Sequence, residues 1–426
     1  HGWTLPNLAS IAEQQMGGFV QVGAHGTGAL IAPVDHYVRE LKLVTPGRGT
    51  LTLSADGKYP ELFHLAKVGL GCLGIVVEVT MDIIPAHNLV EHTFVLTRAE
   101  AREQLATLLT KHKHMRYMWI PHTDAVVCVT NDPDELVAPS VPRDWMAESD
   151  EDKRYAPLRE LLMELDSANF PTMESMEGMG FGELRDALLM ASTGDGFDDG
   201  AGGGGGGPLD VDHVKRVNQA EAEFWKRSEG YQTKPSDQLL QFDCGGQQWV
   251  WEVCFWTGEQ GDGGKKNTND ITFMEELLDR IENGTQGAGR IPAHAPIEQR
   301  WTASSSSKLS PAYFDGTTDG LFSWVGIIQY LPNDETDPRR KHITNYFVND
   351  YCDVLRKVGS PYQMTSHWAK LEQPLSIWKA ADLQVQLRER FGTDTIEQFQ
   401  HARAKLDPKG ILSNPLMDLA FGKPKA

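Results

Sequence analysis

Cysteine is scarce in the 426-residue sequence, which holds five, at Cys72, Cys128, Cys244, Cys254 and Cys352. The count is odd and no two of them form a CxxC pair. The sequence therefore predicts neither a disulfide framework nor a zinc site, and reduced thiols fit better. Cys244 is a candidate reactive thiol, although a free cysteine is more often a small buried side chain.

Basic residues and long apolar runs are also in short supply. Lys and Arg number 40 against 59 Asp and Glu, so the formal charge is 40 − 59 = −19. This excess disfavours nucleic acid as a partner and suits a basic protein, although solubility alone also explains it. No apolar run approaches the ~20 residues that span a bilayer. No signal or transit peptide is visible, and the chain opens at His1 without methionine. We expect a fragment that lacks its natural N-terminus.

The length of 426 residues is enough for two or three domains, and the strand and helix patterns predict an α+β protein. In residues 1–90, strands are predicted at Phe19–Val22 and Ile75–Ile84, with a helix at Pro60–Val68 between them. From residue 91 onward strands alternate with helices, and two predicted strands, Ile297–Ala303 and Phe322–Tyr330, look like neighbours in one sheet. Residues 193–208 include six consecutive glycines, Gly202–Gly207, and predict a flexible insert.

Two glycine-rich segments are candidates for binding a nucleotide. Gly69–Gly74 matches GxGxxG, but a predicted helix precedes it and a predicted strand follows. A Rossmann fingerprint needs the opposite order, so a nicotinamide site is rejected. The other segment, Gly17–Gly28, resembles a strand leading into a turn whose N–H groups face a pyrophosphate. From these residues alone, an ordinary tight turn is the more frequent explanation.

Glu298-Gln299-Arg300 is the candidate site for acid–base chemistry. In a strand, residues two apart face the same side, so Glu298 and Arg300 project into one space and Trp301 points to the other face. The carboxylate is able to accept a hydroxyl proton, and the guanidinium to stabilise an oxyanion. The alternative is a surface ion pair, which contributes little energy.

His367-Trp368-Ala369-Lys370 places a histidine and a lysine three residues apart. If the segment is helical, His367 and Lys370 share a face, and the lysine is able to stabilise negative charge on a cofactor ring. The local sequence alone favours an exposed lysine beside a packed tryptophan. We find no HExxH pattern and no GxSxG elbow.

Taken together, six blocks of sequence resemble the aldonolactone oxidoreductases of the vanillyl-alcohol oxidase superfamily, and within them the plant and algal type that acts on L-galactono-1,4-lactone. HWxK marks the wider group, whereas the blocks at 218–231 and 242–250 are specific to the plant type. The match spans nearly the whole chain except residues 135–208. The blocks are NLASI (7–11), VQVGAHGTG (20–28), NQAEAEFWKRSEGY (218–231), FDCGGQQWV (242–250), APIEQRWT (295–302) and HWAK (367–370).

The resemblance implies a non-covalently bound FAD and three regions. Residues 1–90 are expected to form the second lobe of an FAD-binding domain. Residues 91–360 are expected to form a substrate or cap domain with a mixed or antiparallel sheet, and residues 361–426 to pack on the flavin site. The residues expected to line the cofactor are Ala9, Gly18, Gly23, His25, Gly26, Thr27, Gly28, Gly71, Gly74, Ile75 and His367.

The resemblance also implies a reaction, with Ser10, Glu298, Arg300 and Lys370 around the substrate hydroxyls. Hydride leaves the carbon beside the lactone carbonyl for the flavin, and tautomerisation of the keto-lactone yields ascorbate. Glu298 orients or deprotonates the hydroxyl, Arg300 stabilises the anion, and Lys370 lies against the flavin ring. The cofactor supplies the redox chemistry and the protein supplies position and field.

Ala9 bears on the electron acceptor. Related oxidases often carry glycine there, and a methyl group next to the flavin hinders oxygen. The resemblance thus implies a dehydrogenase that reduces cytochrome c, a basic protein, in the mitochondrial intermembrane space at the inner membrane. Two alternatives stay open: an oxygen-using lactone or alditol oxidase, and a non-enzymatic role with assembling respiratory complex I.

Overall fold

The computed structural model describes residues 2–191, 206–241, 245–261, 264–265, 269–284, 290–314, 320–370 and 380–423. Cys244 and all but the last three residues of the predicted insert lie outside this part of the chain. The four cysteines within it are buried and free. None of the described helices is both long and apolar enough to cross a bilayer.

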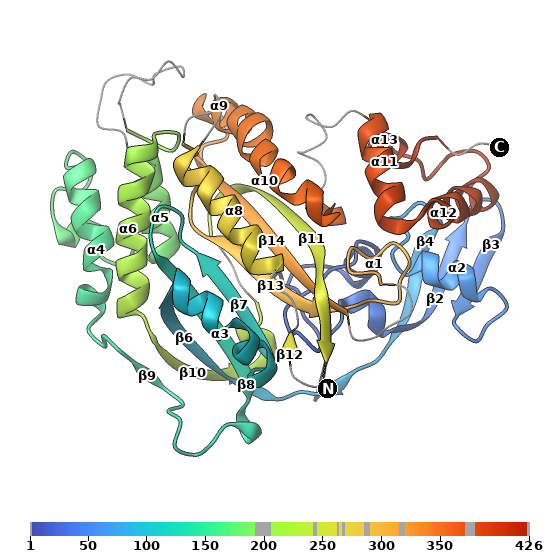
Figure 1. The fold of residues 1–426 in the computed structure, drawn as a ribbon, viewed down its shortest axis with the longest axis horizontal. Helices are drawn as coiled ribbons and strands as arrows, with labels where there is room; N and C mark the ends of the chain where they lie inside the picture. The colour runs from blue at the N-terminus through green and yellow to red at the C-terminus, as the bar shows by residue number, and fades with distance from the viewer. Residues whose placement is uncertain are drawn as a thin grey trace.

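A large antiparallel sheet forms the centre of the molecule (Figure 1). Its strands follow the order β12–β11–β14–β13–β7–β8–β6–β10–β9, and β15 pairs with β11. This arrangement, with helices packed against it, confirms the predicted α+β class. The strands are β6 (Asn88–Thr97), β7 (His114–Trp119), β8 (Ala125–Pro133), β9 (Trp145–Met146), β10 (Gly230–Pro235), β11 (Gln247–Gly261), β12 (Gly264–Lys265), β13 (Ile297–Ala303), β14 (Gly320–Leu331) and β15 (Thr365–Ser366).

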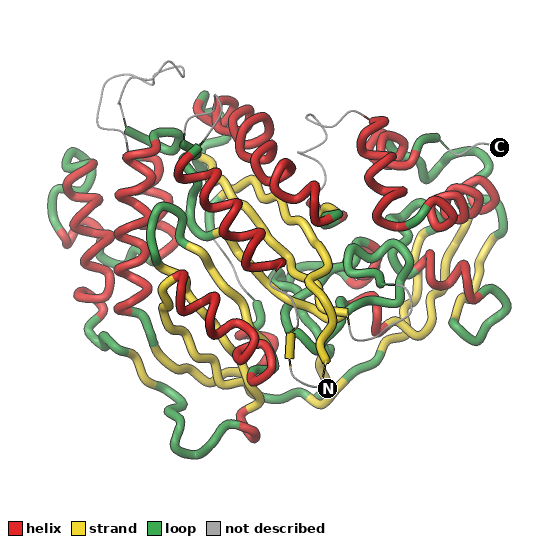
Figure 2. Tube along the Cα trace, in the orientation of Figure 1, coloured by secondary structure: helices red, strands yellow, loops and turns green. Residues whose placement is uncertain are grey.

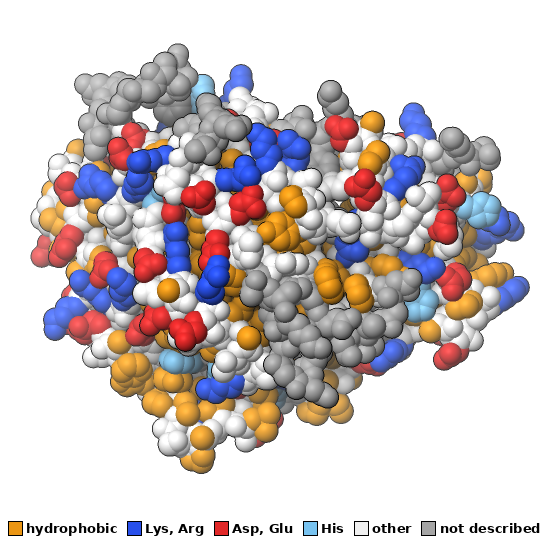
Figure 3. Space-filling view, in the orientation of Figure 1, with side chains coloured by type: hydrophobic (Ala, Val, Ile, Leu, Met, Phe, Trp, Pro, Cys, Tyr) orange, Lys and Arg blue, Asp and Glu red, His pale blue; other side chains and the backbone are white. Residues whose placement is uncertain are grey.

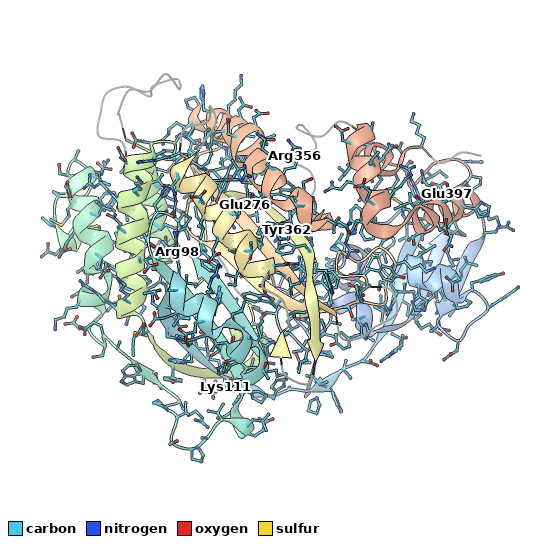
Figure 4. The ribbon with its side chains drawn as sticks, in the orientation of Figure 1. Arg98, Lys111, Glu276, Arg356, Tyr362 and Glu397 are labelled. Atoms are coloured by element: carbon cyan, nitrogen blue, oxygen red, sulfur yellow. The ribbon has the colours of Figure 1, made fainter. Side chains whose placement is uncertain are left out.

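Helices cover one face of this sheet along most of its width (Figure 2). They are α3 (Arg98–Lys111), α8 (Asn269–Asn283), α9 (Arg339–Tyr346) and α10 (Cys352–Gly359). Trp301, fully buried, belongs to the apolar core on this face, as its strand position predicts. Tyr362, labelled in Figure 4 where α8 meets the end of α10, packs against Phe255 and Phe273 of the same core.

The opposite face of the sheet is divided between an apolar core and a polar area. Helices α4 (Glu151–Leu165), α5 (Phe181–Met190) and α6 (Val211–Arg227) pack together over one part, where Ile328 and Tyr330 of β14 are buried. Glu298 and Arg300 of β13 emerge on this same face, but nearer the second, smaller lobe of the molecule, which contains the N-terminal elements. This part of the face thus carries charged side chains, whereas the part beneath the helices is apolar.

The small lobe contains a three-stranded antiparallel sheet in the order β3–β2–β4. Apolar side chains from this lobe and from the C-terminal helices form a single core, so α11, α12 and α13 complete the lobe that the N-terminal elements begin. The elements are α1 (Met16–Gln21), β2 (Val38–Thr45), β3 (Gly49–Ser54), α2 (Pro60–Ala66), β4 (Ile75–Met81), α11 (Ala380–Phe391), α12 (Thr393–Leu406) and α13 (Pro415–Phe421).

One predicted strand in this lobe is wrong. Phe19–Val22 falls largely within helix α1, which buries Phe19 and Val20 in the small-lobe core. A short apolar run does not by itself distinguish a strand from a buried helix, and here tertiary packing overrides the β-branched content. The predicted helix before Gly69–Gly74 and strand after it are confirmed as α2 and β4, which supports rejecting a Rossmann fingerprint.

Several short elements complete the chain. They are β1 (Trp3–Thr4), β5 (Ile84–Pro85), α7 (Ser236–Leu239), the 3-10 helices η1 (Val34–Tyr37), η2 (Asp134–Leu136), η3 (Met173–Met176), η5 (Ser360–Tyr362) and η6 (Trp368–Lys370), and the π-helix η4 (Phe347–Tyr351).

Candidate active site

Three strands place two glutamates in one row across the sheet. Gly326 of β14 lies opposite Glu298 on β13 and opposite Glu252 on β11. Residues paired across antiparallel strands project from the same face. The two carboxylates therefore emerge on the same face, one on each side of Gly326, which has no side chain. Arg300 lies two residues beyond Glu298 on this face. The strand spacing that predicted a shared space for Glu298 and Arg300 is thus realised.

Arg300 joins the two glutamates. Its Nη2 donates a hydrogen bond of 2.5 Å to Glu252 Oε1, and its Nε lies 3.2 Å from Glu298 Oε2. Lys370 Nζ donates to the other oxygen of Glu252 at 2.6 Å. The four side chains form an alternating series, Glu298, Arg300, Glu252 and Lys370, whose formal charges cancel. This is a buried network and not the surface ion pair that the local sequence left open.

Glu252 is the most deeply buried member of the series, with a side chain 1% exposed. Burial alone raises the pKa of Glu252, but Arg300, Lys370 and His25 outweigh it and hold the pKa well below its ordinary value of 4.5. Glu252 is therefore an anion at neutral pH, and it binds the cations that face it.

His25 reaches the same carboxylate from the small lobe. The loop after α1 runs along the end of β13, where Gly28 N donates to Trp301 O at 2.7 Å. The loop brings His25 Nε2 to 3.4 Å from Glu252 Oε2 and stacks its ring on Trp324, with centroids 3.6 Å apart. Burial lowers the pKa of His25 more than Glu252 raises it, so the ring is neutral at pH 7.

The segment His367–Lys370 enters the site from the third side. His367 N donates to Glu252 O at 2.9 Å, and Trp368–Lys370 forms the 3-10 helix η6. Trp368 packs into the small-lobe core, while Lys370 turns toward Glu252 and stays 30% exposed. The predicted sharing of one region by His367 and Lys370 is confirmed. His367 itself is buried, and burial together with Lys370 holds its pKa well below 6.5.

Among the described residues, His25, Glu252 and His367 form a cluster whose possible metal-ligating atoms all lie within 4.8 Å of one another. Both oxygens of Glu252 already accept hydrogen bonds from cations. A divalent ion placed there faces Arg300 and Lys370 at close range, which the electrostatics oppose. The geometry thus suits an internal charge network better than a metal centre.

Glu298 is the member of the series with an unused oxygen. Its Oε2 faces Arg300, whereas its Oε1 is buried and has no hydrogen-bond partner among the described residues. The neighbouring Gly326 leaves room beside it, because a Cβ added there has Glu252 atoms as its three nearest neighbours, at 3.8 to 4.0 Å. The site therefore combines room above Gly326 for a small group, a free oxygen on Glu298 and two nearby cations.

Three of the residues expected to line a cofactor border open space in the small lobe. A Cβ at Gly18 or at Gly71 meets nothing within 4 Å, and Ile75 is 61% exposed. Helix α1 contacts β4, so Gly18 and Ile75 belong to adjoining elements. Leu70 N donates to Gln21 O, which ties the turn of Gly71 to α1. Bare backbone and an exposed apolar side chain fit the flat ring system and phosphates of a flavin nucleotide.

The other expected cofactor glycines are packed against protein. Gly23 abuts Pro311, Gly28 abuts Ile31 and Gly74 abuts Leu43. The N–H groups of Gly23 and Gly28 donate to Val20 and Trp301 carbonyls, and the hydroxyl of Thr27 bonds to Met115. These residues shape the loop that carries His25, and direct contact with a cofactor stays a prediction for them.

Gly26 places the Ala9–Ser10 segment beside the site. A Cβ on Gly26 comes within 2.3 Å of both Leu8 O and Asn7 Oδ1, so only glycine permits this approach. Ala9 and Ser10 follow directly and are half-buried. Within the described part of the chain, Ser10 makes no hydrogen bond to the Glu298–Arg300 pair, so its contact with substrate stays a prediction.

Sequence reasoning missed Glu252, Trp324 and Gly326. Glu252 is the only charged residue in the stretch Trp249–Trp256, where its neighbours are apolar or aromatic. A lone acid in a buried strand needs a cation partner, and that signal was available. Trp324 and Gly326 carry no such signal, because their importance depends on which strands become neighbours.

Comparisons with known proteins identify the relatives of this chain. Residues 79–164 and 266–419 match the family model described as D-arabinono-1,4-lactone oxidase. L-galactono-1,4-lactone dehydrogenase 1 of Oryza sativa is 44% identical over 99% of this chain and 67% of its own length. The Arabidopsis thaliana L-galactono-1,4-lactone dehydrogenase is 43% identical over 99% of this chain and 66% of its own. Both relatives are named mitochondrial, and the chain spans about two thirds of their length.

The chain belongs to the aldonolactone oxidoreductase family. It is thus a member of a family of flavin-dependent oxidoreductases, as the resemblance of its sequence blocks implied. More distant members include the L-gulonolactone oxidase of Bos taurus, 25% identical over 99% of the chain and 77% of that protein.

Solved structures place this aldonolactone oxidoreductase in a known fold. A cholesterol oxidase from B. sterolicum superposes with a TM-score of 0.63 at 14% identity, over 99% of this chain and 77% of that one. A solvent-stable cholesterol oxidase gives a TM-score of 0.64. At such identities the likeness concerns the fold alone, and it agrees with a flavoprotein fold of two lobes.

Proposed function

We propose that this aldonolactone oxidoreductase is an FAD-dependent dehydrogenase that oxidises L-galactono-1,4-lactone to L-ascorbate. The observation that carries the proposal is Glu298. Its Oε1 is buried beside the room above Gly326 and has no hydrogen-bond partner among the described residues, while its Oε2 faces Arg300. A carboxylate held in this way is suited to accept one hydroxyl proton. The relatives at 43% and 44% identity, named for this lactone, support the choice of substrate.

The proposed chemistry assigns each charged group one task. The hydroxyl on the carbon beside the lactone carbonyl donates to Glu298 Oε1, which takes its proton as the C–H bond breaks. Arg300 stabilises the developing oxyanion, and Lys370 supplies positive charge near the flavin ring. FAD, when bound, accepts the hydride. One proton and one hydride leave the substrate, and the keto-lactone that forms tautomerises to ascorbate.

The small lobe is the proposed half of the FAD cradle. Gly18 and Gly71 offer uncovered backbone, and Ile75 offers an exposed apolar side chain. We propose non-covalent binding, because the histidines nearest the site, His25 and His367, are buried and engaged within the network. Release of FAD from the denatured holoenzyme supports this, and flavin absorbance that stays with the precipitated chain contradicts it.

The test of the reaction is a comparison of lactones with the FAD-loaded holoenzyme. L-galactono-1,4-lactone is expected to reduce the flavin faster than L-gulono- or D-arabinono-1,4-lactone, and ascorbate is expected as product. Turnover of none of the three lactones by an enzyme that holds FAD contradicts the proposal.

Cytochrome c is the proposed electron acceptor, with an oxygen-using oxidase as the alternative. The formal charge of −19 favours a basic partner, although acidic and basic side chains are interspersed on the face seen in Figure 3. Ala9, half-buried in the segment beside the site, is the proposed barrier to oxygen. Ala9→Gly is expected to raise hydrogen peroxide formation; unchanged oxygen reactivity contradicts this role, and stoichiometric peroxide from the unaltered enzyme favours the oxidase.

We propose a mitochondrial location, at the inner membrane in the intermembrane space, since the plant relatives are named mitochondrial and cytochrome c resides there. Subfractionation of mitochondria tests the compartment. Association with assembling complex I is a separate proposal, and co-purification with complex I subunits tests it independently of turnover.

A further inference from the structure

We propose that Glu252 is the positioning residue of this site, the anion that holds Arg300 and Lys370 in the places where the reaction needs them. The inference deepens the proposed function and rests on it. Glu252 does not touch the proposed substrate position itself. It acts through the two cations that border that position.

The geometry shows one carboxylate shared by two cations. Each oxygen of Glu252 accepts one hydrogen bond, from Arg300 at 2.5 Å and from Lys370 at 2.6 Å. The cations come from distant parts of the sequence, one from β13 and the other from η6. Among the described residues, Lys370 forms an ion pair with Glu252 alone, whereas Arg300 also faces Glu298. Lys370 therefore depends on Glu252 for its place.

Burial makes this anchor stiff. Glu252 is 1% exposed, and its main-chain carbonyl also accepts from His367 N. A charge-assisted hydrogen bond in such surroundings is short and directional. Arg300 and Lys370 thus keep their orientation without a bound substrate, and the donors are preorganised for charge that develops during oxidation.

The shared anchor also explains why Glu298 keeps a free oxygen. Arg300 divides its donors between the two glutamates, with Nη2 on Glu252 and Nε near Glu298 Oε2. If Glu252 were absent, the whole guanidinium fork would be able to turn onto Glu298 and cover both oxygens. Removing Glu252 is therefore expected to slow the chemical step, and not only to weaken substrate binding.

A missing carboxylate can be supplied from solution. The space above Gly326 adjoins Glu252 directly, since Glu252 atoms are the nearest neighbours of a Cβ placed there. In Glu252→Ala, formate is small enough to occupy the place of the lost carboxylate. The matched control is Glu221→Ala, which removes another buried glutamate, on α6, whose Oε1 accepts from Trp225.

The experiment measures kcat, KM and thermal unfolding of the FAD-loaded holoenzyme with increasing formate, using chloride at equal ionic strength as reference. Glu252→Ala is expected to lose at least about 100-fold in kcat. Formate is expected to restore part of kcat and to raise Tm in this variant only. Glu252→Gln keeps the shape of the side chain without its charge, and it is expected to show the same loss in kcat with no rescue by formate. If Glu252→Ala fails to fold, Glu252→Gln is the variant that tests the loss in kcat.

Two outcomes overturn the proposal. One is a kcat of Glu252→Gln within about twofold of the unaltered enzyme, which is a difference of under 0.5 kcal/mol in the barrier. The other is a formate-dependent rise in Tm with no gain in kcat, which leaves Glu252 a purely structural role. If the unaltered enzyme holds FAD but oxidises no lactone, the proposed function fails. That failure is seen in the unaltered enzyme, before any Glu252 variant is compared, so the two failures are distinguishable.

Discussion

Glu252 and Glu298 lie in the same row of the central sheet, one on each side of Gly326, and Arg300 faces both. This arrangement explains why the two carboxylates differ in the number of their oxygens that are paired with cations. Glu252 has both oxygens occupied by cations, whereas Glu298 has one oxygen free. A single sheet register thus yields one carboxylate with both oxygens paired to cations and one with an oxygen left for the proposed proton transfer.

Arg300 is expected to need its planar fork and not only its charge. A lysine at this position cannot face Glu252 and Glu298 from two different nitrogens, so Arg300→Lys is expected to lower kcat by about 100-fold or more. Arg300→Ala leaves Glu252 short of one cation in a buried place and is expected to cost about 3–5 kcal/mol of unfolding free energy. Denaturant unfolding and steady-state kinetics measure the two effects.

The control for Arg300 is the exposed pair of Arg102 and Glu275, whose side chains are 52% and 46% accessible. Arg102→Lys is expected to change stability by less than about 1 kcal/mol and to leave kcat unchanged. An equal response of the buried and exposed arginines would remove the basis for giving Arg300 a special role.

Gly326 is expected to set the room available to the substrate. Gly326→Ala adds a methyl group at ordinary contact distance from Glu252 and is expected to leave KM within about threefold. Gly326→Val projects further from the strand into the proposed substrate position, and about a tenfold or greater rise in KM is expected. Valine suits a strand, so the register is expected to survive. Identical KM values across the three enzymes would show that the substrate does not occupy this space.

His294 is expected to make stability depend on pH. His294 is buried, and its Nε2 lies 2.8 Å from Pro208 O. Its Nδ1 accepts a hydrogen bond from Tyr330 N, so Nδ1 carries no proton and the ring is neutral. Burial lowers the pKa of His294 to about 3. The unfolded chain therefore binds a proton between pH 6.5 and 3 that the folded chain does not. The resulting stability is complete above pH 6.5 and is lost as pH falls.

The size of this effect follows from proton linkage. Between pH 6.5 and pH 5, His294 alone is expected to cost about 2 kcal/mol of unfolding free energy. His294→Gln removes the titrating group. Between pH 6.5 and pH 5, the unfolding free energy of this variant is therefore expected to fall by about 2 kcal/mol less than that of the unaltered protein. Denaturant unfolding at the two pH values gives the comparison, and parallel losses in the two proteins would refute the assignment.

Part of this site was predictable from the sequence because the signals were local. A two-residue spacing on a strand placed Glu298 and Arg300 together, and the three-residue spacing of a helical turn related His367 to Lys370. The same argument assigned Trp301 to the opposite face, where it is fully buried. These inferences need only the repeat of one element of secondary structure.

The rest depends on contacts between segments far apart in the chain. Glu252 and Glu298 share a row because β14 pairs with both β11 and β13, and no local pattern specifies that order. The wrong strand at Phe19–Val22 has a related cause, since the small-lobe core, not the local β-branched content, selects helix α1. The glycines of the loop beyond α1 are predicted to contact the cofactor. Protein atoms pack closely against Gly26 and Gly28, which local sequence does not reveal, and their contact with a cofactor stays a prediction.

The most direct test of the account is the rate of flavin reduction when FAD-loaded enzyme is mixed anaerobically with L-galactono-1,4-lactone. Glu298→Gln keeps the size of the side chain and removes its capacity to take a proton, so flavin reduction is expected to slow by about 100-fold or more. The same preparation should bind FAD normally, because Glu298 lies outside the proposed flavin cradle. Flavin reduction in Glu298→Gln at close to the unaltered rate would contradict the central claim that this carboxylate accepts the substrate proton.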